Sequence, residues 1–213
     1  MKKHLTSFDL KVIAIVTMTI DHIGFYLYPE IEFLRIIGRI AFPIFAFLTA
    51  QSFRYTHNRN TYFIRMLLLG TLFTAVKFYF EPHSGADIFL TLGLGFGILY
   101  GLEEKQYLMA IVPLVLGILI DVDYGFYGLL LVPLMYYFEN KLLCVVPIMG
   151  VMTWYAKKYL YFSPLQYYAI ISIIILLLYN RQPGYKKAKY FFYIYYPVHI
   201  IVLNLLVYWR NML

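Results

Sequence analysis

The chain has 213 residues, of which 62% are hydrophobic and only 14% are charged. A soluble domain carries roughly 45 to 50% apolar and about 25% charged residues, so this chain has too few polar side chains to cover itself in water. Its mean hydropathy of +0.69 applies to the whole length. This excludes a soluble enzyme with a single anchor, a secreted module and a disordered protein. The composition predicts an all-α, polytopic integral membrane protein.

The formal net charge is +7, and Cys144 is the single cysteine. One cysteine forms no internal disulfide and no cysteine-based metal site, and we expect no metal ligand set in this chain. In a membrane protein, cations indicate which loops face the cytoplasm. The expected partner is therefore the lipid bilayer and not nucleic acid.

Apolar runs that could cross a membrane recur along the chain, separated by short polar connections. We predict about nine transmembrane helices, with eight to ten allowed by the uncertain edges. Their ranges are near 9–28, 33–53, 62–80, 86–102, 107–121, 124–138, 141–156, 165–180 and 190–208. We see no internal repeat, and the connections are too short for a soluble domain, so 1–213 is read as a single transmembrane domain.

The distribution of Lys and Arg predicts the orientation of these helices. With a cytoplasmic N-terminus, nine crossings leave only Lys157, Lys158 and Arg210 in outer connections. The eleven cations in inner connections are Lys2, Lys3, Arg54, Arg59, Arg65, Lys105, Lys141, Arg181, Lys186, Lys187 and Lys189. This bias predicts a multi-pass cell-membrane protein with its C-terminus outside.

Asp21, His22 and Arg39 are polar groups at membrane depth, where a charge costs at least about 2.5 to 3.5 kcal/mol. Asp21 and Arg39 each lie about 10 Å below the outer boundary, so we expect them to pair across the first hairpin. His22 lies about 100° from Asp21 around the helix, and we expect it to face the bundle interior, free of that carboxylate. The pair could simply lock two helices together or belong to a site, and the sequence leaves both open.

Two neighbours favour a site. Pro43 removes the backbone hydrogen bond to the carbonyl of Arg39, which predicts a bent helix with an open polar group. Arg35 lies one turn toward the outside on the face of Arg39 and extends a basic, anion-accepting strip to the surface.

The last apolar run repeats this pattern around Pro197, with His199 near mid-membrane. Such a histidine is either a satisfied core residue or part of a site. Asp121, Asp123 and Tyr124 form an outer mouth on the expected side of Asp21, where an acceptor would enter. The alternative is that these residues form a solvated turn, and the sequence favours this alternative more strongly for Asp123 than for Asp121.

Arg54, Tyr55, Arg59 and Arg65 make the connection near 54–65 basic and aromatic. Clusters of this kind commonly set topology and contact anionic lipid. The functional alternative is a docking surface for a phosphorylated cytoplasmic ligand, which guanidinium groups bind well.

Several stretches resemble the TraX family of polytopic membrane acetyltransferases, whose founding activity is acetylation of the amino terminus of conjugative F-pilin. They are residues 5–11, 18–24 (MTIDHIG), 37–47 (IGRIAFPIFAF), 123–125 (DYG) and 195–199 (YYPVH). The family is similar to larger membrane acyltransferases that use cytoplasmic acetyl-CoA and a histidine base. The resemblance implies His22 or His199 as the base, with Asp21 and Arg39 shaping the site.

The leading hypothesis is transfer of an acetyl or short acyl group from cytoplasmic acyl-CoA to an extracytoplasmic acceptor, a protein amino terminus or a surface polymer. Acyl-CoA would bind through its phosphates at the basic inner mouth and project its thioester toward the bundle centre. One alternative is a small-molecule or ion transporter with a buried polar path. The other is a non-catalytic membrane assembly or immunity partner.

Overall fold

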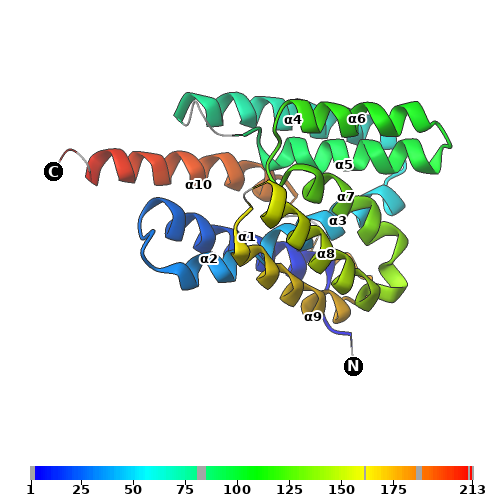
Figure 1. The fold of residues 1–213 in the computed structure, drawn as a ribbon, viewed down its shortest axis with the longest axis horizontal. Coiled ribbons are helices and arrows are strands. Elements are labelled where there is room, and N and C mark those ends of the chain that lie inside the picture. Colours follow the sequence, from blue (N-terminus) through cyan, green and yellow to red (C-terminus); the bar gives the residue numbers. More distant parts are fainter. Residues whose placement is uncertain (1–2, 81–84, 161, 186–188, 211, 213) are drawn as a thin grey trace. The chain divides into compact units, whose positions relative to one another are not determined.

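The computed structural model describes residues 3–80, 85–160, 162–185, 189–210 and 212. Within these residues the chain is helical apart from its connections and two isolated β-bridges, so the all-α prediction is confirmed (Figure 1). The α-helices are α1 (Ser7–Tyr26), α2 (Glu32–Gly38), α3 (Ala41–Tyr55), α4 (Arg59–Phe80), α5 (Ile88–Glu103), α6 (Tyr107–Leu119), α7 (Gly125–Tyr137), α8 (Val145–Tyr159), α9 (Ser172–Leu177) and α10 (Lys189–Arg210). Two 3₁₀ segments, η1 (Glu139–Cys144) and η2 (Pro164–Ile171), precede α8 and α9.

The helix predicted over 33–53, with a bend caused by Pro43, is found as two helices, because α2 ends at Gly38 and α3 begins at Ala41. Pro43 has no N–H to offer the carbonyl of Arg39, and its ring crowds that carbonyl. The expected bend is therefore a full break at Arg39 and Ile40. This break lies beside the residues on which the site depends.

The apolar run predicted as a helix over 165–180 is helical from Pro164 to Leu177, but its first part is the 3₁₀ segment η2. Ser163 caps η2 by accepting a hydrogen bond from the Leu165 N–H at 3.3 Å, and α9 then continues for only six residues. The run 141–156 likewise begins in η1 before α8 takes over. Tight 3₁₀ turns are common at helix starts, and apolar periodicity does not distinguish them from α-helix.

Two helical stretches are long and apolar enough to cross a membrane within the described part of the chain, Glu32–Tyr55 taken across its break and Arg59–Phe80. Only 17% of the most apolar part of Arg59–Phe80 is buried, so α4 is not the core helix of a soluble protein. Helix α6 likewise exposes a run of large apolar side chains, including Leu108, Ile111 and Leu119. An exposed apolar surface of this extent favours contact with lipid over contact with water and supports the prediction of a membrane protein. The count of nine crossings and the orientation stay predictions.

Tertiary contacts divide the chain into two compact units, which are described separately. Unit 2 covers Ala46–Lys141, and within it α5 packs against α4, α6 and α7. Glycines permit these close approaches: a side chain at Gly70 would collide with the backbone of Leu90, and one at Gly101 with Ala110. The glycines of α5 therefore serve close helix packing.

Unit 1 covers Met1–Phe45 and Leu142–Leu213. Here α1 packs on α2 and on α10. Thr6 and Asp9 form a capping box that fixes where α1 begins, and the Leu5 carbonyl accepts a hydrogen bond from the Asn180 N–H at 2.8 Å. At the other end of α1, Arg210 donates to the Leu27 carbonyl at 2.8 Å. Because Thr19 contacts Tyr195 earlier along both helices, α1 and α10 run parallel.

Candidate functional site

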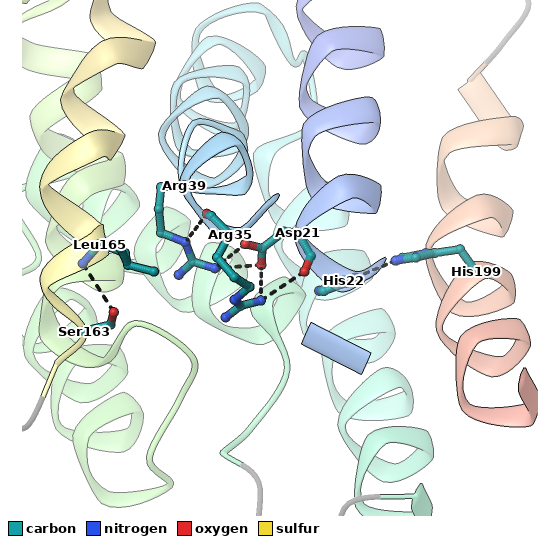
Figure 2. Close-up of polar contacts among 7 residues, drawn as sticks. All are labelled: Asp21, His22, Arg35, Arg39, Ser163, Leu165 and His199. Atoms are coloured by element: carbon teal, nitrogen blue, oxygen red, sulfur yellow. Dashed lines mark hydrogen bonds and ion pairs between the residues drawn. The ribbon is translucent and has the colours of Figure 1, made fainter. Parts of the chain in front are cut away.

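Asp21 accepts charge-assisted hydrogen bonds from two arginines (Figure 2). One nitrogen of Arg39 lies 2.6 Å from both carboxylate oxygens, and a nitrogen of Arg35 lies 2.8 Å from Oδ2. The Asp21 and Arg39 side chains are only 10% and 11% exposed. The predicted Asp21–Arg39 pair is confirmed. With Arg35 the cluster carries one net positive charge in a low-dielectric setting.

Arg35 does not extend a basic strip to the surface, which corrects the sequence-based interpretation. Its guanidinium turns inward to the carboxylate and backbone carbonyl of Asp21 and lies 4.9 Å from the centre of the Phe25 ring. The carbonyl of Arg35 in turn accepts from Nε of Arg39 at 3.3 Å. A buried carboxylate attracts both cations more strongly than the outer surface does.

Gly38 makes this arrangement possible and was not singled out in the sequence. A Cβ at Gly38 would overlap the Asp21 carboxyl group, so only glycine lets α2 approach α1 at this point. Its position on α2, beside Arg39 and one turn after Arg35, was the available signal.

His22 and His199 form one site. Nδ1 of His22 lies 2.7 Å from Nε2 of His199, their ring centres are 5.0 Å apart, and the ring planes differ by 10°. The distance between the two ring centres equals the distance between the two nitrogens plus the radius of each ring. The rings therefore meet edge to edge. The sequence predicted that His22 faces the bundle interior and left its partner open; the parallel packing of α1 and α10 brings the two histidines together.

Tyr195 holds His199 in place from the preceding turn of α10. Its carbonyl lies 3.1 Å from Nδ1 of His199, and its ring lies parallel to the imidazole at 5.3 Å between centres. The Tyr195 hydroxyl is 2.8 Å from Oγ1 of Thr19, one turn before His22. Because Thr19 donates its own proton to the Ile15 carbonyl, the tyrosine hydroxyl is the donor in this bond.

Asp121, Asp123 and Tyr124 lie between α6 and α7 in unit 2. Asp123 pairs with Lys77 at 2.9 Å, so its charge is balanced within the unit. The Asp121 carbonyl accepts from the Ala86 N–H at 2.9 Å, and Tyr124 precedes α7 in a left-handed conformation. These contacts are those of an ordered turn. The role of these residues toward an acceptor stays a prediction.

The basic connection of unit 2 lies among carboxylates, and these neighbours were not predicted from the sequence. Arg54 pairs with Glu139 at 3.1 Å and Arg59 with Glu104 at 3.3 Å. The Glu103 carboxylate accepts from the hydroxyls of two tyrosines, Tyr136 and Tyr137. Tyr55 and Arg65 are exposed. Lys186 and Lys187, two of the cations expected in inner connections, lie outside the described residues.

In the described ranges, no group of three or more His, Cys, Asp or Glu side chains is gathered as metal ligands would be. The site in unit 1 consists of an imidazole pair and an Arg–Asp–Arg cluster. His22 directly follows Asp21 on α1, so the two features are neighbours in the fold.

The family model described as TraX protein matches residues 7–207. The chain belongs to the TraX family. The match covers nearly the whole chain, including α1, the break between α2 and α3, and the two histidines, so the resemblance read from the sequence motifs is confirmed.

Two relatives of this TraX-family protein are similar in sequence. "Probable fimbrial assembly protein FimC, serogroup H1" of Dichelobacter nodosus is 27% identical over 237 aligned residues, 93% of this chain and 94% of the relative. An uncharacterized protein of Rickettsia prowazekii (strain Madrid E) is 40% identical over 86 residues, 40% of this chain and 33% of the relative. The alignment thus spans about a third of the Rickettsia protein. No solved structure shows a significant match.

Proposed function

We propose that this protein is a membrane acyltransferase that moves an acetyl or short acyl group from acyl-CoA to an amine or hydroxyl of an extracytoplasmic acceptor. The observation that carries the proposal is the edge-to-edge pair of His22 and His199 beside a buried Arg–Asp–Arg cluster. An imidazole is a suitable general base near neutral pH, and a guanidinium stabilises a developing oxyanion. TraX-family membership supports the same reaction class.

The chemistry needs one base and one positive group. The imidazole takes the proton from the acceptor N–H or O–H while that nitrogen or oxygen forms a bond to the thioester carbonyl carbon. Negative charge develops on the carbonyl oxygen, where the net positive charge of the Asp21 cluster is stabilising. The C–S bond then breaks, and the imidazolium returns its proton to the departing CoA thiolate. No acyl-enzyme forms, and Cys144 has no part in this route.

Acyl-CoA is expected to bind through its phosphates to Arg54, Tyr55, Arg59 and Arg65. Arg59 is engaged with Glu104, but both side chains are more than a third exposed, and such a pair contributes at most about 1 kcal/mol. A phosphate can therefore replace the carboxylate as the partner of Arg59. Arg54 is held more firmly, because its partner Glu139 is buried and its guanidinium lies 4.6 Å from the centre of the Tyr136 ring.

A pilus subunit is the first acceptor to test, because one relative carries the name of a fimbrial assembly protein. Its amino terminus would have to lose a proton before attacking a thioester, which suits a site with a neutral imidazole. The proposed acceptor side comprises Asp121, Asp123 and Tyr124, with Lys77 balancing Asp123.

The direct test incubates the purified protein with ¹⁴C-acetyl-CoA and with fractions of the cell surface, one of them enriched in pilus subunits. We expect label in one acceptor fraction with the wild type, and a loss of about 10²- to 10⁴-fold in His22→Ala. His4→Ala, at an exposed histidine before the start of α1, is the matched control. Full activity in both His22→Ala and His199→Ala would rule out the mechanism.

A non-catalytic role in assembly is the second candidate, because the name of the fimbrial relative specifies assembly and not transfer. In that case the buried charges only lock helices together. A folded Asp21→Asn, His22→Gln, Arg39→Gln triple variant that still supports pilus assembly would favour this candidate, since acyl transfer cannot survive those changes.

A further inference from the structure

The two histidines have unequal hydrogen-bonding positions. Nδ1 of His199 faces the carbonyl of Tyr195 at 3.1 Å, and a carbonyl oxygen can only accept. Nδ1 of His199 therefore carries the proton. In a neutral imidazole only one nitrogen is protonated, so Nε2 of His199 carries the lone pair.

The tautomer of His199 determines the tautomer of His22. Nε2 of His199 lies 2.7 Å from Nδ1 of His22, and as an acceptor it requires a proton on that nitrogen. Nε2 of His22 then carries the lone pair of its own ring. The chain of donors runs from His22 to His199 to the Tyr195 carbonyl, so a proton taken up at Nε2 of His22 leaves a positive ring whose Nδ1–H already donates to an acceptor.

We propose that His22 is the proton-accepting catalytic residue and that His199 is a positioning residue, which holds the His22 ring in its Nδ1-protonated tautomer and orientation. The inference rests on the proposed acyl transfer and assigns unequal roles to the two histidines of that site. Tyr195 supports the arrangement, because its hydroxyl anchors it to Thr19 on α1 while its carbonyl orients His199. The role of His199 is that of the orienting group that accepts a hydrogen bond from a catalytic base.

Glutamine substitutions separate the two roles. The amide oxygen of glutamine reaches about as far as Nε2 of histidine and accepts a hydrogen bond, but a glutamine does not take up a proton near neutral pH. We expect His22→Gln to lower kcat by about 10²- to 10⁴-fold. His199→Gln should retain most activity, while His199→Leu, which offers no acceptor, should lose about 10- to 100-fold. His4→Gln is the control.

The rescue by glutamine at 199 is the decisive comparison. His199→Gln as inactive as His22→Gln, or no more active than His199→Leu, would overturn the unequal roles. Thermal unfolding of each variant in detergent separates loss of activity from loss of fold.

A second readout does not depend on activity. In ¹⁵N-histidine-labelled wild type, above the pH at which the rings titrate, the ¹⁵N chemical shifts of both imidazoles should report protonation at Nδ1. The His22→Gln and His199→Gln samples assign the signals. Protonation at Nε2 of either ring would overturn the relay even if acyl transfer is observed. Nδ1 protonation without acyl transfer in the wild type would uphold the relay geometry and reject the proposed function.

Discussion

At the scale of single residues, Asp21 determines the electrostatics of the site. It is the one carboxylate in a cluster with Arg35 and Arg39, and the three side chains are at most 25% exposed. Removing one partner of a buried ion pair is costly because the other charge stays in a low-dielectric setting. The three residues should therefore differ in how much their loss destabilises the protein.

Asp21→Asn should lower the free energy of unfolding by up to about 3 to 5 kcal/mol, because it takes the carboxylate away from two cations at once. Arg35→Gln should cost less, since Asp21 and Arg39 then form a balanced pair. Thermal unfolding of the two variants in the same detergent measures the difference. An equal or larger loss in Arg35→Gln would contradict this account of the cluster.

At the scale of elements, the close approach of α2 to α1 depends on Gly38. The point of approach is the Asp21 side chain, and α2 ends at Gly38, with Arg39 and Ile40 between it and α3. Within a few residues, Pro43 interrupts the helix and Gly38 lets it approach α1.

Gly38→Ala should destabilise the protein by about 1 to 3 kcal/mol, as overpacking does, because the new methyl group overlaps the Asp21 carboxyl group. It should also lower acyl transfer by shifting the residue before His22. Gly150→Ala on α8 is the matched control, with open space around the added methyl group. That variant should be neutral or more stable by up to about 1 kcal/mol. Equal stabilities for the two variants would show that α1 and α2 tolerate a wider separation.

At the scale of the whole molecule, the parallel direction of α1 and α10 bears on topology. Three contacts follow one another along both helices: Thr19 with Tyr195, His22 with His199, and the Leu27 carbonyl with Arg210. Two parallel membrane helices begin on the same side and end on the same side. If both cross, the first and last residues of the chain face opposite compartments, as the cation distribution predicts.

Reporter fusions test this topology. A fluorescent protein that folds only in the cytoplasm should be bright at the N-terminus and dark at the C-terminus, and alkaline phosphatase, which is active only outside, should give the opposite pattern. Matching signals at both ends would show that α1 or α10 does not cross, and would contradict the predicted odd number of crossings.

Much of the fold was predictable because apolar composition and helical periodicity are local properties. The limits of α1, α4, α5, α6, α7 and α10 agree with the predicted runs to within about three residues. The failures have local causes as well. The break at Arg39 follows from Pro43, whose effect was read as a bend, and the 3₁₀ segments η1 and η2 have no distinctive apolar pattern.

Composition and short motifs were enough to predict an all-α membrane protein, its resemblance to the TraX family and the pairing of Asp21 with Arg39, since a charge at membrane depth requires a partner. The inward turn of Arg35 and the meeting of His22 with His199, residues far apart in the chain, became visible in three dimensions alone. These contacts depend on how α1, α2 and α10 pack, and no local pattern encodes that packing. The proton assignment in the histidine pair likewise comes from the three-dimensional position of the Tyr195 carbonyl.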